Sequence, residues 1–326
     1  MRSLITGASG FIGSHLAAHL AASGHDVTVL VRSTSRKDDL TAAGLHFALG
    51  DIRDAASLRA AVRGMANVFH LGAVFSAPDR ETYFAVNTQG TVNLLEACRA
   101  ENPGLRRFVF VSSISAAGPS PAGAALDEDA PSRPVSDYGR SKLAAEEAVL
   151  AAGRALPVTV IRPPNVLGPR QRELVESIKL LGRKIKPLIG RRNSRTSIAA
   201  VADIVRALAL VAEDPRSVGR VYYVTDGRVY TWREITDTIA AAVGLGRFYL
   251  PIPFPAQYAV AAAAEAVAGI RGSVPLVSRD HVRAVRRYDW VFDSSRIGRE
   301  LGFRPSMDMA AAVRAAVDAF RSGGEA

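Results

Sequence analysis

The sequence predicts an α/β fold, with a doubly wound parallel sheet in its first half and a smaller, mostly helical lobe in its second. Short, uniformly apolar runs alternate with helical segments from residue 3 to residue 162. This alternation is typical of βαβ units with right-handed crossovers. After Pro163 and Pro164 it stops, and helical segments dominate. We therefore expect one domain at 1–166 and a second lobe at 167–326, with some segments of the lobe packing back on the first domain.

The expected elements follow one another in a regular order. Uniformly apolar strands indicate a sheet that is buried on both faces, and glycines end the first two helices. The predicted strands are 3–6, 27–31, 46–49, 67–71, 107–112, 158–162 and 221–225. The predicted helices are 12–23, 58–63, 88–100, 138–152, 201–213, 231–243, 255–268 and 306–322, and residues 118–137 are expected to form a long loop.

Composition narrows the function classes. Apolar residues make up 48% and charged residues 22% of the chain, as in folded globular proteins. No uncharged apolar run of about 18 residues is present, so no spanning helix is expected. A strand-like run at residues 2–6 leaves no room for a signal peptide. Because Cys98 is the single cysteine, we expect neither an intrachain disulfide nor a metal site, and a cytoplasmic location.

The net charge of +10 comes mainly from arginine and is expected to be spread over a solvated surface. One basic cluster stands out, but no aromatic residue interleaves it, so nucleic-acid binding is not expected. An Ala-rich segment at 255–269, acting with this cluster at a membrane surface, is the less favoured alternative. The cluster consists of Arg183, Lys184, Lys186, Arg191, Arg192 and Arg195.

A glycine-rich stretch lies between the first strand and the first helix. Gly7, Gly10 and Gly13 have the spacing G-x-x-G-x-x-G. A side chain at either of the first two glycines would keep the backbone from a pyrophosphate, and Gly13 would let the helix pack closely on the strand. The helix N-terminus offers free N–H groups and a positive dipole end. These features predict a dinucleotide-binding domain of the Rossmann type.

The residues after the second strand indicate which dinucleotide binds. An acidic residue there would bond the ribose hydroxyls of NAD and repel the extra phosphate of NADP. The chain instead has Arg32, Ser33 and Arg36, which can hold a 2′-phosphate by charge-assisted hydrogen bonds. NADP(H) is therefore the preferred cofactor, and NAD(H) is the alternative if these are solvated loop residues. Asp51 and Ile52, after the third strand, are expected to flank the adenine.

A second motif predicts proton transfer. Tyr138 and Lys142 form Y-x-x-x-K on a predicted helix, where positions four apart share a face. With eight tyrosines and five lysines in 326 residues, only about 0.1 chance matches are expected. Ser113 lies at the C-terminal end of the fifth strand, the edge outside which ligands bind in open α/β sheets. Its neighbours Ser112 and Ser115 are alternatives for the same role.

The side chains of Ser113, Tyr138 and Lys142 suit the proton transfer that accompanies hydride transfer. A phenol with a pKa of about 10 is a poor acid–base catalyst at neutral pH. A lysine ammonium and a cationic nicotinamide can stabilise the phenolate, and a pKa lowered by about three units corresponds to about 4 kcal/mol. The serine hydroxyl can polarise a substrate carbonyl or bond its alkoxide. Ser113, Tyr138 and Lys142 are therefore the candidate catalytic residues.

Together these motifs resemble the extended short-chain dehydrogenases/reductases, the NAD-dependent epimerase/dehydratase family. Matching stretches occur along nearly the whole chain, at 6–13, 50–52, 70–73, 86–95, 110–113, 138–142, 162–166, 201–203, 293–296 and 301–305. The resemblance implies that Tyr138 exchanges the proton, that Lys142 also bonds the nicotinamide ribose, and that the helices at 88–100 and from about 138 form a homodimer. It places Gly7, Gly10, Phe11, Ile12, Leu71, Gly72, Ala73, Pro163 and Val166 around the cofactor, and Ser115 and Asn165 against substrate.

The resemblance also separates branches of the family. Sugar-nucleotide dehydratases carry an Asp-Glu pair just after the catalytic hydroxyl, where this chain has Ile114-Ser115-Ala116, so that reaction is excluded. Epimerases usually offer an arginine for the diphosphate near the position of Thr196, and a histidine where this chain has Ala200. The arginines that could substitute are Arg192, Arg195 and Arg283.

The apolar segment 248–268 suits an apolar substrate, although plain helix packing would also explain it. With this apolar segment in its C-terminal lobe, the chain resembles the branch of the family that contains 3β-hydroxysteroid dehydrogenases and dihydroflavonol reductases. We therefore expect an NADP(H)-preferring oxidoreductase that interconverts a secondary alcohol and a ketone on an apolar, steroid-like small molecule. The alternatives are a nucleotide-sugar epimerase with tightly bound NAD and a non-catalytic cofactor sensor, which would have no need of Tyr138 and Lys142.

Overall fold

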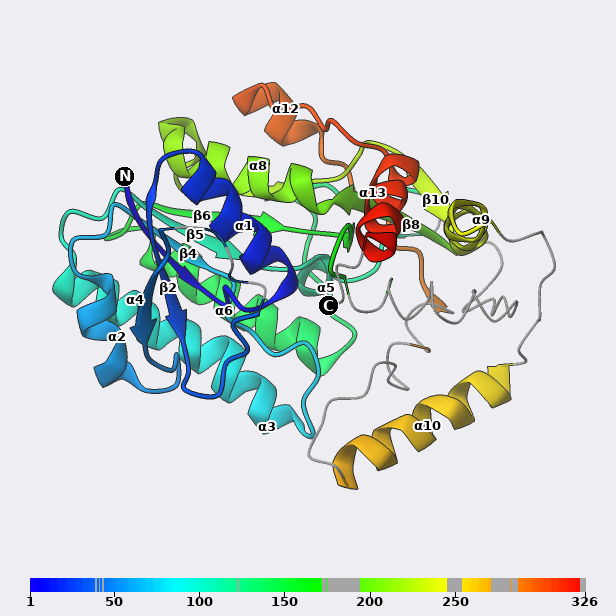
Figure 1. Cartoon of the computed structure of the whole chain (residues 1–326), viewed down its shortest axis with the longest axis horizontal. Coiled ribbons are helices and arrows are strands. Elements are labelled where there is room, and N and C mark those ends of the chain that lie inside the picture. Colours follow the sequence, from blue (N-terminus) through cyan, green and yellow to red (C-terminus); the bar gives the residue numbers. More distant parts are fainter. Residues whose placement is uncertain are drawn as a thin grey trace.

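The computed structural model contains one large and one small β-sheet with helices around them (Figure 1). It describes the whole chain except residues 39, 41, 43, 122, 172–173, 175–193, 245–253, 271–281, 283–286 and 323–326, and the side chains of 254 and 265–270. Most of the predicted basic cluster and Arg283 therefore lie outside the described residues, as does the first part of the apolar segment that begins at 248.

The large sheet has seven strands, all parallel, in the order β3-β2-β1-β4-β5-β6-β9. The order reverses between β1 and β4, which is the switch point outside which ligands bind in such sheets. This topology confirms the predicted doubly wound fold. The strands are β1 (Arg2–Thr6), β2 (Asp26–Val31), β3 (His46–Leu49), β4 (Asn67–His70), β5 (Arg107–Val111), β6 (Val158–Arg162) and β9 (Val221–Tyr223).

Helices cover both faces of this sheet (Figure 1). One face packs against α1 (Phe11–Ala22) and α8 (Val201–Glu213), and the other against α2 (Ala55–Val62), α4 (Gly90–Glu101) and α6 (Asp137–Ala152). The helix predicted at 58–63 begins earlier, because Asp54 caps it by accepting a hydrogen bond from the Ala56 amide. The predicted division at residue 166 stays a prediction, and α8 and β9 pack with the sheet of the first half.

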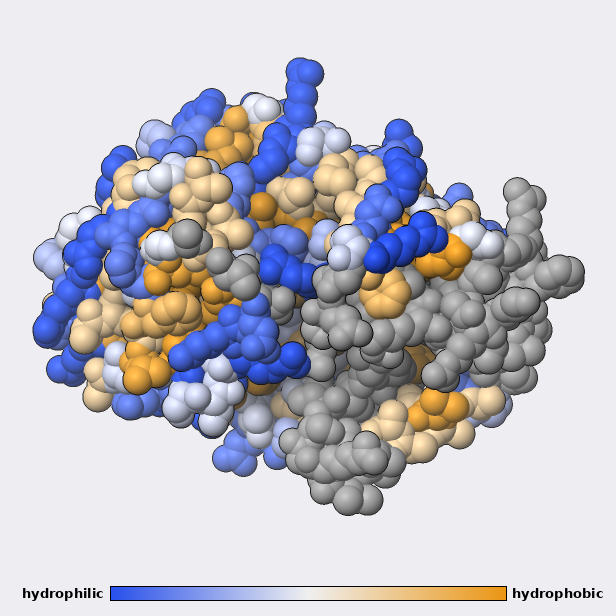
Figure 2. All heavy atoms as spheres, viewed as in Figure 1, coloured by the Kyte–Doolittle hydropathy of each residue, from blue (hydrophilic) through white to orange (hydrophobic). Residues whose placement is uncertain are grey.

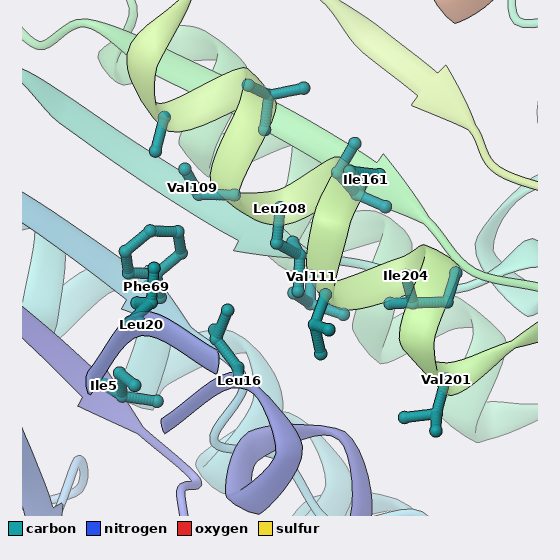
Figure 3. Close-up of a cluster of buried hydrophobic side chains, with 14 of the residues drawn as sticks. Ile5, Leu16, Leu20, Phe69, Val109, Val111, Ile161, Val201, Ile204 and Leu208 are labelled. Carbon is teal, nitrogen blue, oxygen red and sulfur yellow. The ribbon is translucent and has the colours of Figure 1, made fainter. Parts of the chain in front are cut away.

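The strand register explains the core on the α1 side. Val29, Ile5, Phe69 and Val109 are paired in register across four adjacent strands and are all fully buried. Leucines and isoleucines of α1 and α8 pack on this row (Figure 3). Every second residue of a strand faces the same side, so apolar runs without alternation bury both faces at once.

The second half contains a three-stranded sheet that the sequence analysis missed. Its order is β10-β8-β7, with β7 (Asn165–Leu167), β8 (Arg195–Ala200) and β10 (Val229–Thr231). Strands β7 and β10 have three residues each, and the longer β8 mixes polar and apolar residues, so these strands carry no clear two-residue alternation. Around this sheet pack α9 (Trp232–Ala242) and α13 (Met309–Arg321), which were predicted with slightly different ends.

Several other elements were also missed. The helix predicted at 88–100 is preceded by α3 (Arg80–Tyr83) and a π-helical segment, Phe84–Gln89. The remaining ones are α5 (Ile114–Ala117), a 3₁₀ turn (Pro215–Ser217) and α12 (Ser295–Leu301). The described residues between 118 and 136 contain no helix or strand, and their β-type pairing is limited to single bridges at Ser120 and Leu126. The predicted long loop is therefore confirmed.

The Ala-rich segment forms α10 (Phe254–Ile270), at the lower right of Figure 1. Tan and orange side chains are visible at this place in the space-filling view of Figure 2, and Val260 is 66% exposed. No helix among the described residues has the length and apolarity needed to cross a membrane.

Candidate active site

The glycine loop leads from β1 into α1, and its glycines are required by the protein's own backbone. Gly7 has a φ of +72°, and a Cβ there would lie 2.6 Å from the Gly72 amide nitrogen, in the segment after β4. At Gly13 a Cβ would lie 2.2 Å from the Gly7 carbonyl oxygen. The missing side chain therefore lets α1 pack closely on the loop that directly follows β1, and the helix–strand packing expected of Gly13 stays a prediction. The compact turn that results brings the loop to the switch point.

The N-terminus of α1 is suited to an anion. Gly10 is the exposed N-cap residue, no side chain caps the helix, and no acidic residue lies in its first turn. The first-turn amides, including those of Phe11 and Ile12, therefore keep N–H groups available at the positive end of the helix dipole. Both side chains are half-buried and pack on the core.

At the end of β2, the predicted phosphate-binding residues lie on the surface. Arg32 and Ser33 are exposed, and the Arg32 amide donates to Ser35 Oγ at 2.9 Å, which forms a turn. Arg36 is also exposed and its Nε lies 3.3 Å from Asp38 Oδ2. Among the described residues, the Arg32 guanidinium has no ion pair, whereas that of Arg36 has one.

Asp51 and Ile52 lie beside this region, after β3. Arg53 binds the Asp51 carboxylate, with Nη2 2.7 Å from Oδ2. This hydrogen bond holds the pKa of Asp51 below its usual value, and the positive charge of Arg32 adds to the effect. The Ile52 carbonyl accepts from Asn93 Nδ2 at 3.0 Å, so α4 anchors the segment.

Leu71, Gly72 and Ala73 follow β4 at the same edge of the sheet. Leu71 packs against the α1 side of the core, and the Gly72 amide donates to Thr6 Oγ1 at 3.2 Å. Ala73 is exposed. The structure thus brings the segment after β4 next to the glycine loop, as the contact between Gly7 and Gly72 requires.

Tyr138, Lys142 and Ser113 come together at the C-terminal ends of β5 and β6. Helix α6 begins at Asp137, where Ser136 Oγ accepts from the Gly139 amide at 3.1 Å, and this cap places Tyr138 in the first turn. Ser113 is the N-cap of α5, and its Oγ accepts from the Ser115 amide at 3.1 Å. Burial raises the pKa of Tyr138 to about 12, and the nearby Ser113 hydroxyl opposes this only in part.

Lys142 lies one helical turn after Tyr138 and is only 2% exposed. Its Nζ donates to the Val111 carbonyl at 2.8 Å and lies 4.2 Å from the centre of the Phe110 ring. Burial lowers the pKa of Lys142 to about 7, and the negative charge of Glu146 acts in the opposite direction. The expected lowering of the tyrosine pKa is therefore absent in the protein alone, because burial acts on the phenol and the ammonium at the same time.

Two aromatic residues beside Tyr138 were missed by the sequence analysis. The Phe75 ring makes an edge contact with the Tyr138 ring at 5.0 Å between centroids, and the Tyr83 ring lies at 6.2 Å. The Tyr83 hydroxyl donates to the Phe75 carbonyl at 3.3 Å. Phe75 is nevertheless 65% exposed. Its place five residues after β4 was the only signal in the sequence, and it did not show where the ring points.

A buried polar network fixes the backbone around these residues. His70 is 1% exposed and lies 2.6 Å from Thr6 Oγ1 and 2.9 Å from Thr91 Oγ1. Burial lowers the pKa of His70 to about 3, so the ring is neutral. Asn87, in the π-helical segment, binds both the amide and the carbonyl of Val74, at 2.8 and 3.0 Å. The residue before Phe75 is therefore held firmly.

The predicted substrate residues lie at the same sheet edge. Ser115 is half-buried in α5, and Asn165 begins β7 with its Nδ2 2.8 Å from Thr196 Oγ1. Pro163 is buried, and its carbonyl accepts from the Ile114 amide at 3.1 Å. Val166 is also buried and pairs with Ala199 of β8.

The position at which epimerases usually carry their diphosphate-binding arginine is buried and does not face solvent in this chain. Thr196 is fully buried, and its hydroxyl is occupied by Asn165. Arg195 points elsewhere and binds Asp289 through Nη2 at 3.0 Å. Arg192 and Arg283 lie outside the described residues.

Comparison with known proteins places the chain among nucleotide-dependent enzymes. Residues 3–225 match the model of the NAD dependent epimerase/dehydratase family. The 3 beta-hydroxysteroid dehydrogenase/Delta 5-->4-isomerase of Mycobacterium tuberculosis is 31% identical, with 93% of this chain and 86% of the relative covered. The UDP-glucose 4-epimerase of Vibrio cholerae is 31% identical, with 77% and 78% covered. The crystal structure of UDP-glucose 4-epimerase from Thermotoga maritima superposes with a TM-score of 0.83 over the whole of both chains, at 23% identity.

Proposed function

The chain belongs to the NAD-dependent epimerase/dehydratase family, and on this premise we propose that it interconverts a secondary alcohol and a ketone on an apolar, steroid-like substrate. One observation carries the proposal. The Ser113 hydroxyl lies close enough to Tyr138 to lower its pKa, and the buried Lys142 lies one turn further along α6. This arrangement supports proton exchange at a single oxygen of the substrate.

In the proposed mechanism each protein group has one task. Ser113 Oγ bonds the substrate oxygen, and Tyr138 takes the proton from an alcohol or gives it to a developing alkoxide. Lys142 stabilises the phenolate through its positive charge. A bound nicotinamide dinucleotide supplies or accepts the hydride. Phe75 and Tyr83, beside the Tyr138 ring, support an apolar contact to the carbon skeleton of the substrate.

The glycine loop fits a dinucleotide. The turn at Gly7 and the uncapped N-terminus of α1 leave free amides where a pyrophosphate would bind. In this proposal the pyrophosphate lies against Gly10, Phe11 and Ile12. The adenosine lies near Asp51 and Ile52, and Leu71, Gly72, Ala73, Pro163 and Val166 line the nicotinamide side. NADP(H) is the proposed preference, because the Arg32 guanidinium is unpaired among the described residues and Ser33 is exposed next to it.

The steroid-like substrate class is supported from two sides. Thr196 is buried and Arg195 is paired with Asp289, so neither supplies a diphosphate-binding cation. The similarity to a hydroxysteroid dehydrogenase points in the same direction. A homodimer through α4 and α6 remains part of the proposal, since the two helices lie side by side and Leu150 of α6 is 37% exposed.

The second candidate is a nucleotide-sugar epimerase, which the similarity to the Vibrio cholerae enzyme favours. The two candidates differ in cofactor turnover. A reductase consumes NADPH in proportion to product, whereas an epimerase restores its cofactor in every cycle.

The test is a panel of 3β-hydroxysteroids, flavanonols, simple ketones and UDP-sugars, assayed for NADPH oxidation and NADP reduction and by product analysis. We expect stoichiometric cofactor turnover with an apolar alcohol or ketone. Conversion of a UDP-sugar to its epimer, without net change of cofactor, would replace the first candidate by the second.

A further inference from the structure

A buried ion pair lies directly behind the lysine of the candidate active site. Glu146 follows Lys142 by one turn of α6 and is 1% exposed. Nε of Arg162 lies 3.2 and 3.1 Å from the two carboxylate oxygens, and Nη2 lies 2.5 Å from Oε1. Removing such a pair from water has a desolvation cost that apolar side chains of similar volume would avoid. Its position beside the active site therefore suggests a task beyond packing.

The other hydrogen bonds of Arg162 join the pair to the walls of the site. Nη1 donates to the Tyr223 hydroxyl at 2.9 Å, and Nη2 donates to Ser132 Oγ at 3.1 Å, in the loop before α6. Arg162 is the last residue of β6, directly before Pro163. The carboxylate of Glu146 is therefore fixed in one place, because its partner is held from two further elements.

Among the described residues, the ionisable groups that interact with the Lys142 ammonium are His70 from β4 and Glu146 from α6, with Arg162 of β6 behind Glu146. Tyr138 precedes Lys142 by one turn of α6, and β5 contributes the Val111 carbonyl and the Phe110 ring. His70 and Tyr138 are neutral near pH 7, since burial lowers the pKa of the first and raises that of the second. Among the described residues, Glu146 is thus the anion that favours a charged Lys142.

We propose that Glu146 is a positioning residue that keeps the Lys142 ammonium charged beside β5 and so sets the pH range in which Tyr138 can act. The carboxylate acts through the lysine, because Tyr138 lies two helical turns away from it. The inference rests on the proposed function for its catalytic consequence. The charge state of Lys142, however, can be measured without substrate or cofactor.

The experiment is an NMR titration of protein labelled with ¹³C-lysine, in which five lysines give a simple spectrum and Lys142→Arg assigns the signal of Lys142. In Glu146→Gln, whose amide oxygen still accepts from Arg162, we expect Lys142 to titrate about one pH unit lower than in the wild-type protein. In alcohol oxidation, a smaller protonated fraction of Lys142 stabilises the phenolate of Tyr138 less. The ascending limb of the pH–kcat profile should therefore move about one unit to higher pH, with about tenfold less turnover on that limb.

Glu147→Gln is the matched control, since it removes the same charge from an exposed neighbour on α6. We expect this variant to leave both the titration and the pH profile unchanged, and Glu146→Asp to restore most of the wild-type values. If Glu146→Gln does not fold, the double variant Glu146→Gln with Arg162→Met also removes the unpaired guanidinium. Because the pair then loses both charges, the Lys142 titration should be lowered by less than in Glu146→Gln, but in the same direction.

A Lys142 titration in folded Glu146→Gln that coincides with the wild-type curve would overturn the inference, even if the enzyme proves to be a dehydrogenase. Conversely, a lowered lysine titration together with full turnover in Tyr138→Phe would retain the electrostatic coupling and refute the proposed function.

Discussion

The two ends of the proposed cofactor site lie along one edge of the same sheet, yet their polar groups are solvated very differently. At the nicotinamide end, His70 and Lys142 are 1% and 2% exposed, and hydrogen bonds fix them on neighbouring elements. At the adenosine end, Arg32, Ser33 and Arg36 are exposed on a surface turn. Charges interact strongly when water is excluded and weakly when water and salt screen them. We therefore expect the buried end to control the reaction rate and the exposed end to adjust cofactor preference.

The largest effect should follow a change at the buried end. Tyr138→Phe keeps the ring against Phe75 but removes the hydroxyl, so kcat should fall about 10³-fold, because general acid–base catalysis is lost. Affinity for the cofactor, measured by fluorescence titration, should stay within about twofold. Tyr83→Phe is the control, because it removes a neighbouring hydroxyl, which donates to the Phe75 carbonyl, and keeps the ring, so it should keep most of the turnover. Equal loss in both variants would contradict the special role of Tyr138.

The buried end should also give stability a pH dependence. Burial lowers the pKa of His70 from 6.5 to about 3. Between these values the unfolded chain binds more protons than the folded one, so the free energy of unfolding should decrease as the pH falls through this window, by about 1.4 kcal/mol per unit. Urea unfolding at pH 6.5 and at about pH 5 should therefore differ by about 2 kcal/mol from this group alone. His70→Gln should lose that difference, and an unchanged difference would show that another group causes it.

A smaller effect is expected where the buried end meets solvent. Phe75→Ala removes an exposed ring that rests on Tyr138, so the KM for an apolar substrate should rise about tenfold while kcat changes little. Val218→Ala, at another exposed apolar side chain, is the control. The comparison is steady-state kinetics of both variants with a bulky and a small ketone. A KM for the bulky substrate that matches the wild-type value would remove Phe75 from the substrate contact.

The smallest effect is expected at the exposed end. Arg32→Ala should raise the KM for NADPH about fivefold and leave that for NADH unchanged, since solvent screens this charge. Arg36→Ala should have less effect, because Asp38 already pairs with Arg36. Steady-state kinetics with NADPH and NADH distinguishes the effects of the two substitutions on the KM values. A wild-type protein that prefers NADH would rule out the proposed role of Arg32.

The difference between buried and exposed residues also explains which elements of the fold could be predicted from the sequence. Most strands of the large sheet were predictable, because burial on both faces leaves apolar runs such as residues 108–111. Strands β7, β8 and β10 were missed, because they mix polar and apolar residues. The π-helical segment that carries Asn87 was missed too, since its sequence is compatible with an ordinary helix. The hydrogen bonds of Asn87 to Val74 and Ser141 show its structural role.

For the candidate site, local spacing was sufficient wherever one element carries the residues. Tyr138 and Lys142 share a helix face, and the glycines share one turn, so sequence distance already implies proximity. Phe75 and Arg162 could not be placed in this way. They come from separate strands and loops, and their contacts with Tyr138 and Glu146 depend on how α6 packs on β4, β5 and β6.

By itself, the sequence determined the order of strands and helices, the glycine turn and the tyrosine–lysine pair, because each of these follows from periodicity or spacing within a few residues. Only the tertiary structure decided which groups lose their water. Burial lowers the pKa values of Lys142 and His70, raises that of Tyr138 and places an ion pair behind the lysine. Desolvation depends on every element that surrounds a group, and no local pattern of residues records it.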